Sequence, residues 1–179
     1  MVGQQIAWIA VGFLLSFILM FFNTKFLWKI TPYLYVFGLG LMVLPLIFYS
    51  ESLVASTGAK NWIAIRGVTL FQPSEFMKIS YILMLSRLVV HFLQQHKQDE
   101  RTLALDFFLI LKLGLYTVPV LVLLTLQSDL GTALVFVAIY GGIVLLSGVS
   151  WKIILPVFLT GVLLLGGFLF IFISDGGRA

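Results

Sequence analysis

The sequence has no cysteine and few charged residues, and both absences narrow the class of protein. Without cysteine, neither a disulfide framework nor a thiolate metal site can form. Charged residues make up only 10% of the 179 positions, against about 25% in soluble domains. A disordered chain would be polar and charge-rich, so disorder is excluded. The 11 basic residues are scattered along the chain, so we expect no nucleic-acid partner.

Residues and motifs that bind metal ions or nucleotides are also scarce in the sequence. The two histidines, His91 and His96, stand five positions apart, whereas a helical metal-binding pair needs four. No G-x-x-x-x-G-K-[ST] loop is present, so nothing points to a bound nucleotide. We therefore predict no metal site at these histidines and no nucleotide cofactor.

Apolar residues are what the sequence has in excess. They make up 61% of the chain, and a soluble protein of this size cannot bury that much apolar surface. A membrane-spanning helix needs roughly 20 apolar residues, and its backbone must be hydrogen-bonded within the segment. We therefore expect an all-α, polytopic transmembrane helical bundle that forms one domain over residues 1–179. About six spans are predicted, at residues 5–22, 32–49, 74–94, 107–126, 130–146 and 151–173.

Three sequence signals predict where these helices start and bend. Thr31 followed by Pro32 is typical of a helix cap and first helical residue. Ser74 is a candidate cap for the third span. Pro45, Pro119 and Pro156 fall inside or near the ends of spans, where proline can kink a helix.

The short connections predict the orientation in the membrane. Seven cations lie toward one side and four toward the other, and the richer side is expected to face the cytoplasm. The loop at residues 96–106 is then cytoplasmic, the loop at 50–73 is external, and both chain ends lie outside. The seven are Lys25, Lys29, Arg87, Lys97, Arg101, Lys112 and Lys152, and the four are Lys60, Arg66, Lys78 and Arg178.

The external loop and the start of the third span hold the first candidate site. Long loops are often functional, and this one is followed by Glu75 and, three residues later on the same helical face, Lys78. Simpler roles exist for each residue. Glu75 can serve the helix dipole, Lys78 can extend to the membrane surface, and Trp62 can anchor at the interface. The alternative is that Lys78 faces a wet cavity and binds an anion.

The second candidate site is the polar segment between the fourth and fifth spans, at residues 127–132. Ser128 or Asp129 can simply cap the next helix. The functional alternative is that Asp129 lines an external cavity and pairs with Lys78, because ionisable residues within membranes are usually functional. Asp129 or Glu75 can otherwise bind a divalent cation. The two helix N-termini add positive potential suited to phosphate groups.

Three separated segments resemble the signatures of the SEDS family (shape, elongation, division and sporulation). The resemblance is greatest to the rod-shape branch of Gram-positive cocci, with the cell-division branch as the near alternative. Two positions depart from the pattern: Leu70 stands where some relatives have arginine, and Ser128 where proline is commoner. The matching segments are Gly58-Ala59-Lys60-Asn61-Trp62, Phe71-Gln72-Pro73-Ser74-Glu75 with Lys78, and Gln127-Ser128-Asp129-Leu130-Gly131-Thr132.

The resemblance implies a membrane glycosyltransferase that polymerises lipid II into peptidoglycan strands outside the bacterial plasma membrane. It also implies a class B penicillin-binding protein as partner. Glu75, Lys78 and Asp129 match the family's external polar cavity, and Lys60 and Arg66 are candidates for pyrophosphate contacts. Members have about ten spans and an aspartate on a later loop, so we expect a partial chain whose catalytic residue lies beyond Ala179. The remaining motif residues are Trp62, Gln72, Pro73, Ser74, Gly131 and Thr132.

Two other functions fit the same residues. A flippase or transporter of the lipid-linked precursor would need a polar path to the cytoplasmic side, and the inner halves of the spans have few polar residues. A non-catalytic membrane scaffold for a penicillin-binding protein would need only the helices.

Overall fold

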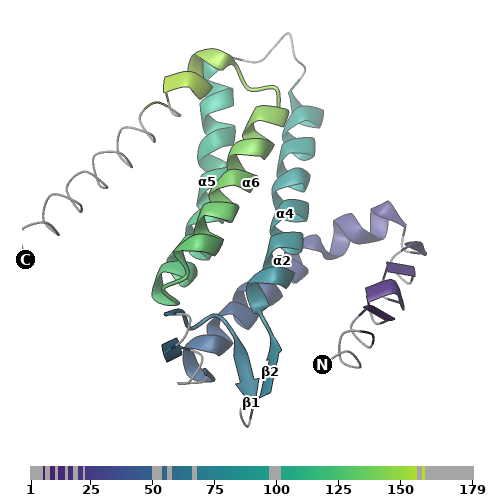
Figure 1. Cartoon of the computed structure of the whole chain (residues 1–179). Helices are drawn as coiled ribbons and strands as arrows, with labels where there is room; N and C mark the ends of the chain where they lie inside the picture. Colours follow the sequence, from purple (N-terminus) through teal and green to yellow (C-terminus); the bar gives the residue numbers. More distant parts are fainter. Residues whose placement is uncertain are drawn as a thin grey trace, which may run out of the picture.

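The computed structural model shows a bundle of long helices with a short β-hairpin at one end (Figure 1). It describes residues 6, 9–10, 12–14, 16–17, 20–21, 23–49, 54–55, 58–65, 68–96, 102–156 and 159. The elements are α2 (Thr24–Ile47), β1 (Ile63–Ile65), β2 (Val68–Phe71), α4 (Pro73–Gln95), α5 (Leu103–Leu126) and α6 (Leu130–Leu146).

The described helices confirm the predicted transmembrane bundle. Helices α2, α4 and α5 have 23 or 24 residues and are apolar enough to cross a membrane, while α6 is a shorter apolar helix. At 1.5 Å per residue, 24 residues extend about 36 Å, which exceeds the thickness of the hydrocarbon core. These helices correspond to the second to fifth predicted spans. The first predicted span is described only in part, and most of the sixth lies outside the described residues.

Helix α2 begins earlier than predicted. Its cap is Asn23, whose side chain accepts a hydrogen bond from the Lys25 N–H at 3.2 Å. Pro32 lies inside the helix, and the Thr31 hydroxyl donates to the Leu27 carbonyl at 2.7 Å. The predicted helix start at Thr31 and Pro32 is therefore wrong.

A side chain from another helix allows α2 to continue through this proline. Pro32 has no N–H, so the Trp28 carbonyl loses its helical donor. Arg87 of α4 replaces it, because its Nη1 donates to the Trp28 oxygen at 2.6 Å. Neighbouring helices commonly satisfy carbonyls that prolines leave free within membranes. Arg87 thus satisfies the carbonyl that Pro32 leaves free and ties α2 to α4.

Two further interhelix bonds lie beside the other internal prolines. Gln127 donates through Nε2 to the Met42 carbonyl, three residues before the second proline of α2. The Tyr35 hydroxyl donates to the Tyr116 carbonyl, three residues before Pro119 of α5. Each internal proline of α2 and α5 therefore lies three or four residues after a carbonyl that another part of the chain binds.

We expect Arg87→Leu to lower the free energy of unfolding by about 1–3 kcal/mol, because the Trp28 carbonyl would lose its donor. In a Pro32→Ala background the helix regains a backbone N–H that can donate to the Trp28 carbonyl. Arg87→Leu should therefore lower the free energy of unfolding by less in that background. A double-mutant cycle of denaturation in detergent micelles measures this difference. Equal costs in both backgrounds would show that the Arg87 bond does not serve the proline bend.

Helix α4 is the central helix and contacts α2, α5 and α6. Its Tyr81 is fully buried, with its ring 5.1 Å from that of Phe136 in α6 and its hydroxyl 2.7 Å from the Thr117 hydroxyl in α5. At Gly38 of α2, a Cβ would lie only 2.7 Å from the Met77 sulfur, so glycine permits the close approach of α2 and α4. These contacts fix the start of α4 relative to the other helices.

The connection between α2 and α4 contains a β-hairpin, which differs from the loop expected from the sequence. Strands β1 and β2 pair antiparallel, with Ile63 opposite Phe71 and Ile65 opposite Val68. The chain leaves β2 directly into α4, whose first residue is Pro73. The hairpin and the start of α6 lie at the same end of the bundle (Figure 1).

Candidate functional site

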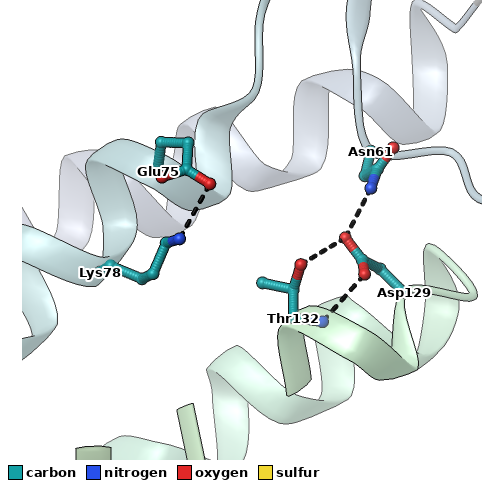
Figure 2. A network of polar contacts seen from close by, with 5 residues as sticks. All are labelled: Asn61, Glu75, Lys78, Asp129 and Thr132. Carbon is teal, nitrogen blue, oxygen red and sulfur yellow. Dashed lines mark hydrogen bonds and ion pairs between the residues drawn. The ribbon is translucent and has the colours of Figure 1, made fainter. Parts of the chain in front are cut away.

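Three segments meet at the hairpin end of the bundle (Figure 2). The start of α4 contributes Glu75 and Lys78, the start of α6 contributes Asp129 and Thr132, and the segment before β1 contributes Asn61. Two segments are also joined through the backbone, because the Lys60 N–H donates to the Gln127 carbonyl at 2.8 Å. The structure therefore brings both predicted polar sites to one end of the protein.

Asp129 caps α6 and is nearly buried, with 8% of its surface exposed. Its Oδ1 accepts the Thr132 N–H at 3.1 Å, and its Oδ2 accepts the Thr132 hydroxyl at 2.8 Å. Oδ2 also accepts from Asn61 Nδ2 at 2.6 Å. The predicted capping role is confirmed and falls to Asp129. All three donors are neutral groups.

The turn before Asp129 has a left-handed residue. Ser128 has φ of 59°, and its N–H donates to the Thr125 carbonyl while the Asp129 N–H donates to that of Leu124, both at 3.0 Å. This is the Schellman pattern that closes many helices, usually with glycine at the left-handed position. Proline cannot adopt a positive φ, so this turn requires the departure noted at Ser128.

We expect Ser128→Gly to raise the free energy of unfolding by about 0.5–1 kcal/mol, because glycine adopts positive φ without steric cost. Ser128→Pro should lower it by about 3 kcal/mol. Ser147, the cap at the end of α6, has φ of −72° and provides a matched control. Ser147→Gly should be destabilising, and stabilisation by both glycine substitutions in denaturation experiments would contradict the argument.

Lys78 pairs with Glu75 at 2.8 Å, as expected for residues three apart on one helical face. The alternative pairing with Asp129 is not formed, because Asp129 takes its donors from Asn61 and Thr132 instead. The side chains of Lys78 and Glu75 are 27% and 57% exposed. Ion pairs this open to solvent contribute little to stability, so the ammonium can exchange partners at low cost.

The start of α4 differs in one respect from the prediction. The helix begins at Pro73, with Gln72 as the cap residue and without a capping bond from its side chain. Ser74 is therefore inside the first turn, so its predicted capping role is wrong. Its hydroxyl is buried and has no hydrogen-bond partner among the described residues. Glu75 does lie in the first turn, as predicted.

The remaining predicted residues surround this cluster or fall outside it. The Lys60 ammonium lies 4.5 Å from the centre of the Tyr49 ring, so it contacts an aromatic face and not the carboxylates. Trp62 is 36% exposed, and Gly131 lies in the first turn of α6. Arg66 lies outside the described residues.

Metal binding has little support from these side chains. Within the described ranges, no group of three or more His, Cys, Asp and Glu residues could hold a metal ion. Asp129 already accepts three hydrogen bonds, and Glu75 is engaged by Lys78. The two carboxylates therefore do not fit a divalent cation, and no chemical step is assigned to one.

The contact of Asn61 with Asp129 is not predicted from the sequence. Asn61 stands within the first motif, but the charged neighbours were weighed instead. The one signal in the sequence is its position beside Lys60 within the first motif. A contact with Asp129, 68 residues away, can only be seen in the folded chain.

Long apolar helices with a lysine–carboxylate pair and a buried carboxylate at one end define a polytopic membrane protein with a polar site at one end of its bundle. The chain belongs to the FtsW, RodA and SpoVE family, described as cell cycle proteins, whose sequence model matches residues 1–178. The family predicted from the motifs is thus confirmed.

Curated relatives of two kinds match the chain. It is 30% identical over 157 residues to the peptidoglycan glycosyltransferase MrdB of Helicobacter pylori, covering 87% of this chain and 39% of the relative. It is 32% identical over 155 residues to MrdB of Escherichia coli, covering 86% and 38%. It is 28% identical over 149 residues to a probable peptidoglycan glycosyltransferase FtsW of Hydrogenovibrio crunogenus, covering 83% and 35%. The chain spans less than half the length of these relatives.

Solved structures support the same fold. The rod-shape-determining protein RodA of Thermus thermophilus matches with a TM-score of 0.63 and 30% identity, over 87% of this chain and 47% of that one. A chain of a peptidoglycan synthase complex, described for its coordination of polymerization and crosslinking, matches with a TM-score of 0.67 and 29% identity. That match covers 90% of this chain and 44% of the other.

Proposed function

We propose that the full-length gene product carrying this sequence is a peptidoglycan glycosyltransferase that polymerises lipid II outside the bacterial plasma membrane. The observation that carries the proposal is the Lys78–Glu75 pair at the start of a spanning helix, beside the start of α6. The names of the curated relatives support this activity. The external placement follows from the cation count of the loops.

The reaction explains why a cation is needed there. A sugar hydroxyl forms a new bond to the anomeric carbon of a second sugar, and the bond from that carbon to its lipid diphosphate breaks. The diphosphate leaves with the electron pair, and the hydroxyl proton passes to a base. Positive groups near the diphosphate stabilise this developing charge. We assign the base to no described residue of this chain.

Lys78 is the residue proposed to bind the diphosphate. Its ammonium is partly exposed and held by one exposed carboxylate, so a more highly charged diphosphate can displace Glu75. The N-termini of α4 and α6 add positive potential at the same end of the bundle. Contacts from Lys60 and Arg66 remain predictions, and Lys60 would have to leave the Tyr49 ring to make one.

A class B penicillin-binding protein is the proposed partner. The match to a chain of a peptidoglycan synthase complex supports such an assembly. The glycan strands made by this chain's full-length product would then be crosslinked by the partner.

The proposal is tested with the purified full-length gene product in proteoliposomes that contain lipid II. We expect glycan polymer on gels together with released undecaprenyl diphosphate. Lipid translocation without polymer would contradict the proposal and favour a flippase. Co-purification of a penicillin-binding protein without polymer or translocation would favour a scaffold.

A further inference from the structure

Asn61 is joined to the Asp129 carboxylate across a large sequence separation. Its Nδ2 lies 2.6 Å from Oδ2, and the two residues are 68 positions apart (Figure 2). The other two donors to this carboxylate belong to Thr132, in the first turn of the same helix. Asn61 is thus the donor that fixes Asp129 relative to the loop before β1.

The orientation of the Asn61 amide follows from its surroundings. A carboxylate accepts only, so the amide nitrogen and not the oxygen must face Asp129. The amide oxygen is buried and has no partner among the described residues. The bond to Asp129 is therefore the one polar contact that the described structure gives to this side chain.

This contact also has an electrostatic consequence. A buried carboxylate is costly unless it is hydrogen-bonded, and Asp129 meets this need with neutral donors alone. It therefore does not require the Lys78 ammonium, which stays paired with the more exposed Glu75. Without Asn61, Asp129 would have an open acceptor site at the end of the bundle where Lys78 lies.

We propose that Asn61 is a positioning residue that holds Asp129 in place and leaves Lys78 available for the lipid diphosphate. This inference rests on the proposed function. The backbone bond from the Lys60 N–H to the Gln127 carbonyl holds the same loop against the same turn, so Asn61 projects from a fixed segment. A substitution at Asn61 should therefore weaken substrate use more than it weakens the fold.

The first test compares Asn61→Ala with Asn23→Ala in the full-length gene product. Asn23 has no part in the proposed reaction. Its substitution by alanine likewise removes one side-chain hydrogen bond, the capping bond at the start of α2. We expect Asn61→Ala to raise KM for lipid II about tenfold or more with a smaller change in kcat, which is how lost substrate binding appears. Asn23→Ala should leave both constants close to native. Equal kinetics for the two variants would overturn the proposal.

The second test is the pH profile of Asn61→Asp. This variant places a second carboxylate against Asp129, and two carboxylates this close cannot both ionise easily. One shared proton restores the bond, so the ratio of variant to native activity should rise several-fold between about pH 8 and about pH 6. Glu75, Lys78, Lys60 and Tyr49 are other ionisable groups described at this end, and the native profile corrects for them. A ratio that does not change with pH would overturn the proposal.

A thermal double-mutant cycle separates this inference from the proposed function. If the native gene product makes no polymer, the proposed function fails, and the Asn61 contact is judged by unfolding midpoints. Asn61→Ala and Asp129→Ala together should shift the midpoint by less than the sum of the single shifts. Additive shifts would overturn the positioning role even if polymerisation is found.

Discussion

Lys78→Ala in the full-length gene product is expected to reduce glycan polymerisation at least about a hundredfold. The ammonium is the one cation that the described structure places with the carboxylates at the end of the bundle. Removing a group that stabilises charge on a leaving diphosphate typically costs two to three orders of magnitude. The measurement is the initial rate of polymer formation from lipid II in proteoliposomes.

Two companion variants make this result specific. Lys112→Ala removes a half-buried lysine from α5 and should keep nearly native activity. Glu75→Gln removes the carboxylate partner but leaves the ammonium, so it should cost much less than Lys78→Ala. If Lys78→Ala and Lys112→Ala retain the same activity in well-folded protein, Lys78 does not act on the substrate.

The second large effect is expected at Asp129. Asp129→Ala removes the cap of α6 and leaves the Asn61 amide without its acceptor, so the free energy of unfolding should fall by about 1–3 kcal/mol. Polymerisation should fall at least about a hundredfold, because the segment next to the proposed diphosphate site loses its anchor. Denaturation and polymerisation assays measure the two losses separately.

The variant Asp129→Asn separates the helix-capping role of this side chain from the role of its negative charge. Asparagine caps a helix about as well as aspartate, so stability should be nearly native. If the negative charge itself matters, activity should still be lost. Native activity in Asp129→Asn would restrict this residue to its capping role.

The features set by local chemistry could be predicted from the sequence. Long apolar runs identified α2, α4, α5 and α6 as helices, and α6 begins and ends as expected. The sequence predicts Ser128 or Asp129 as the cap of α6, and the structure assigns it to Asp129, whose side chain needs only the next helical turn. The Glu75–Lys78 pair followed from helical spacing alone.

The features that depend on distant residues could not be predicted. The start of α2 was misplaced because Arg87, 59 residues away, satisfies the carbonyl that Pro32 leaves free. The functional alternative for Asp129 pairs it with Lys78 on the basis of charge, whereas the fold supplies the neutral Asn61. Patterns in a single sequence contain no information on which loops meet in the folded chain. Tertiary hydrogen bonds of this kind therefore cannot be predicted from them.

The most direct test of the account is the equilibrium binding of lipid II to the full-length gene product in lipid nanodiscs. We predict that Lys78→Ala weakens binding about tenfold or more, equivalent to about 1.4 kcal/mol, while Lys112→Ala binds like the native protein. Binding of lipid II by Lys78→Ala with native affinity would contradict the assignment of the diphosphate to the end of the bundle where α4 and α6 begin.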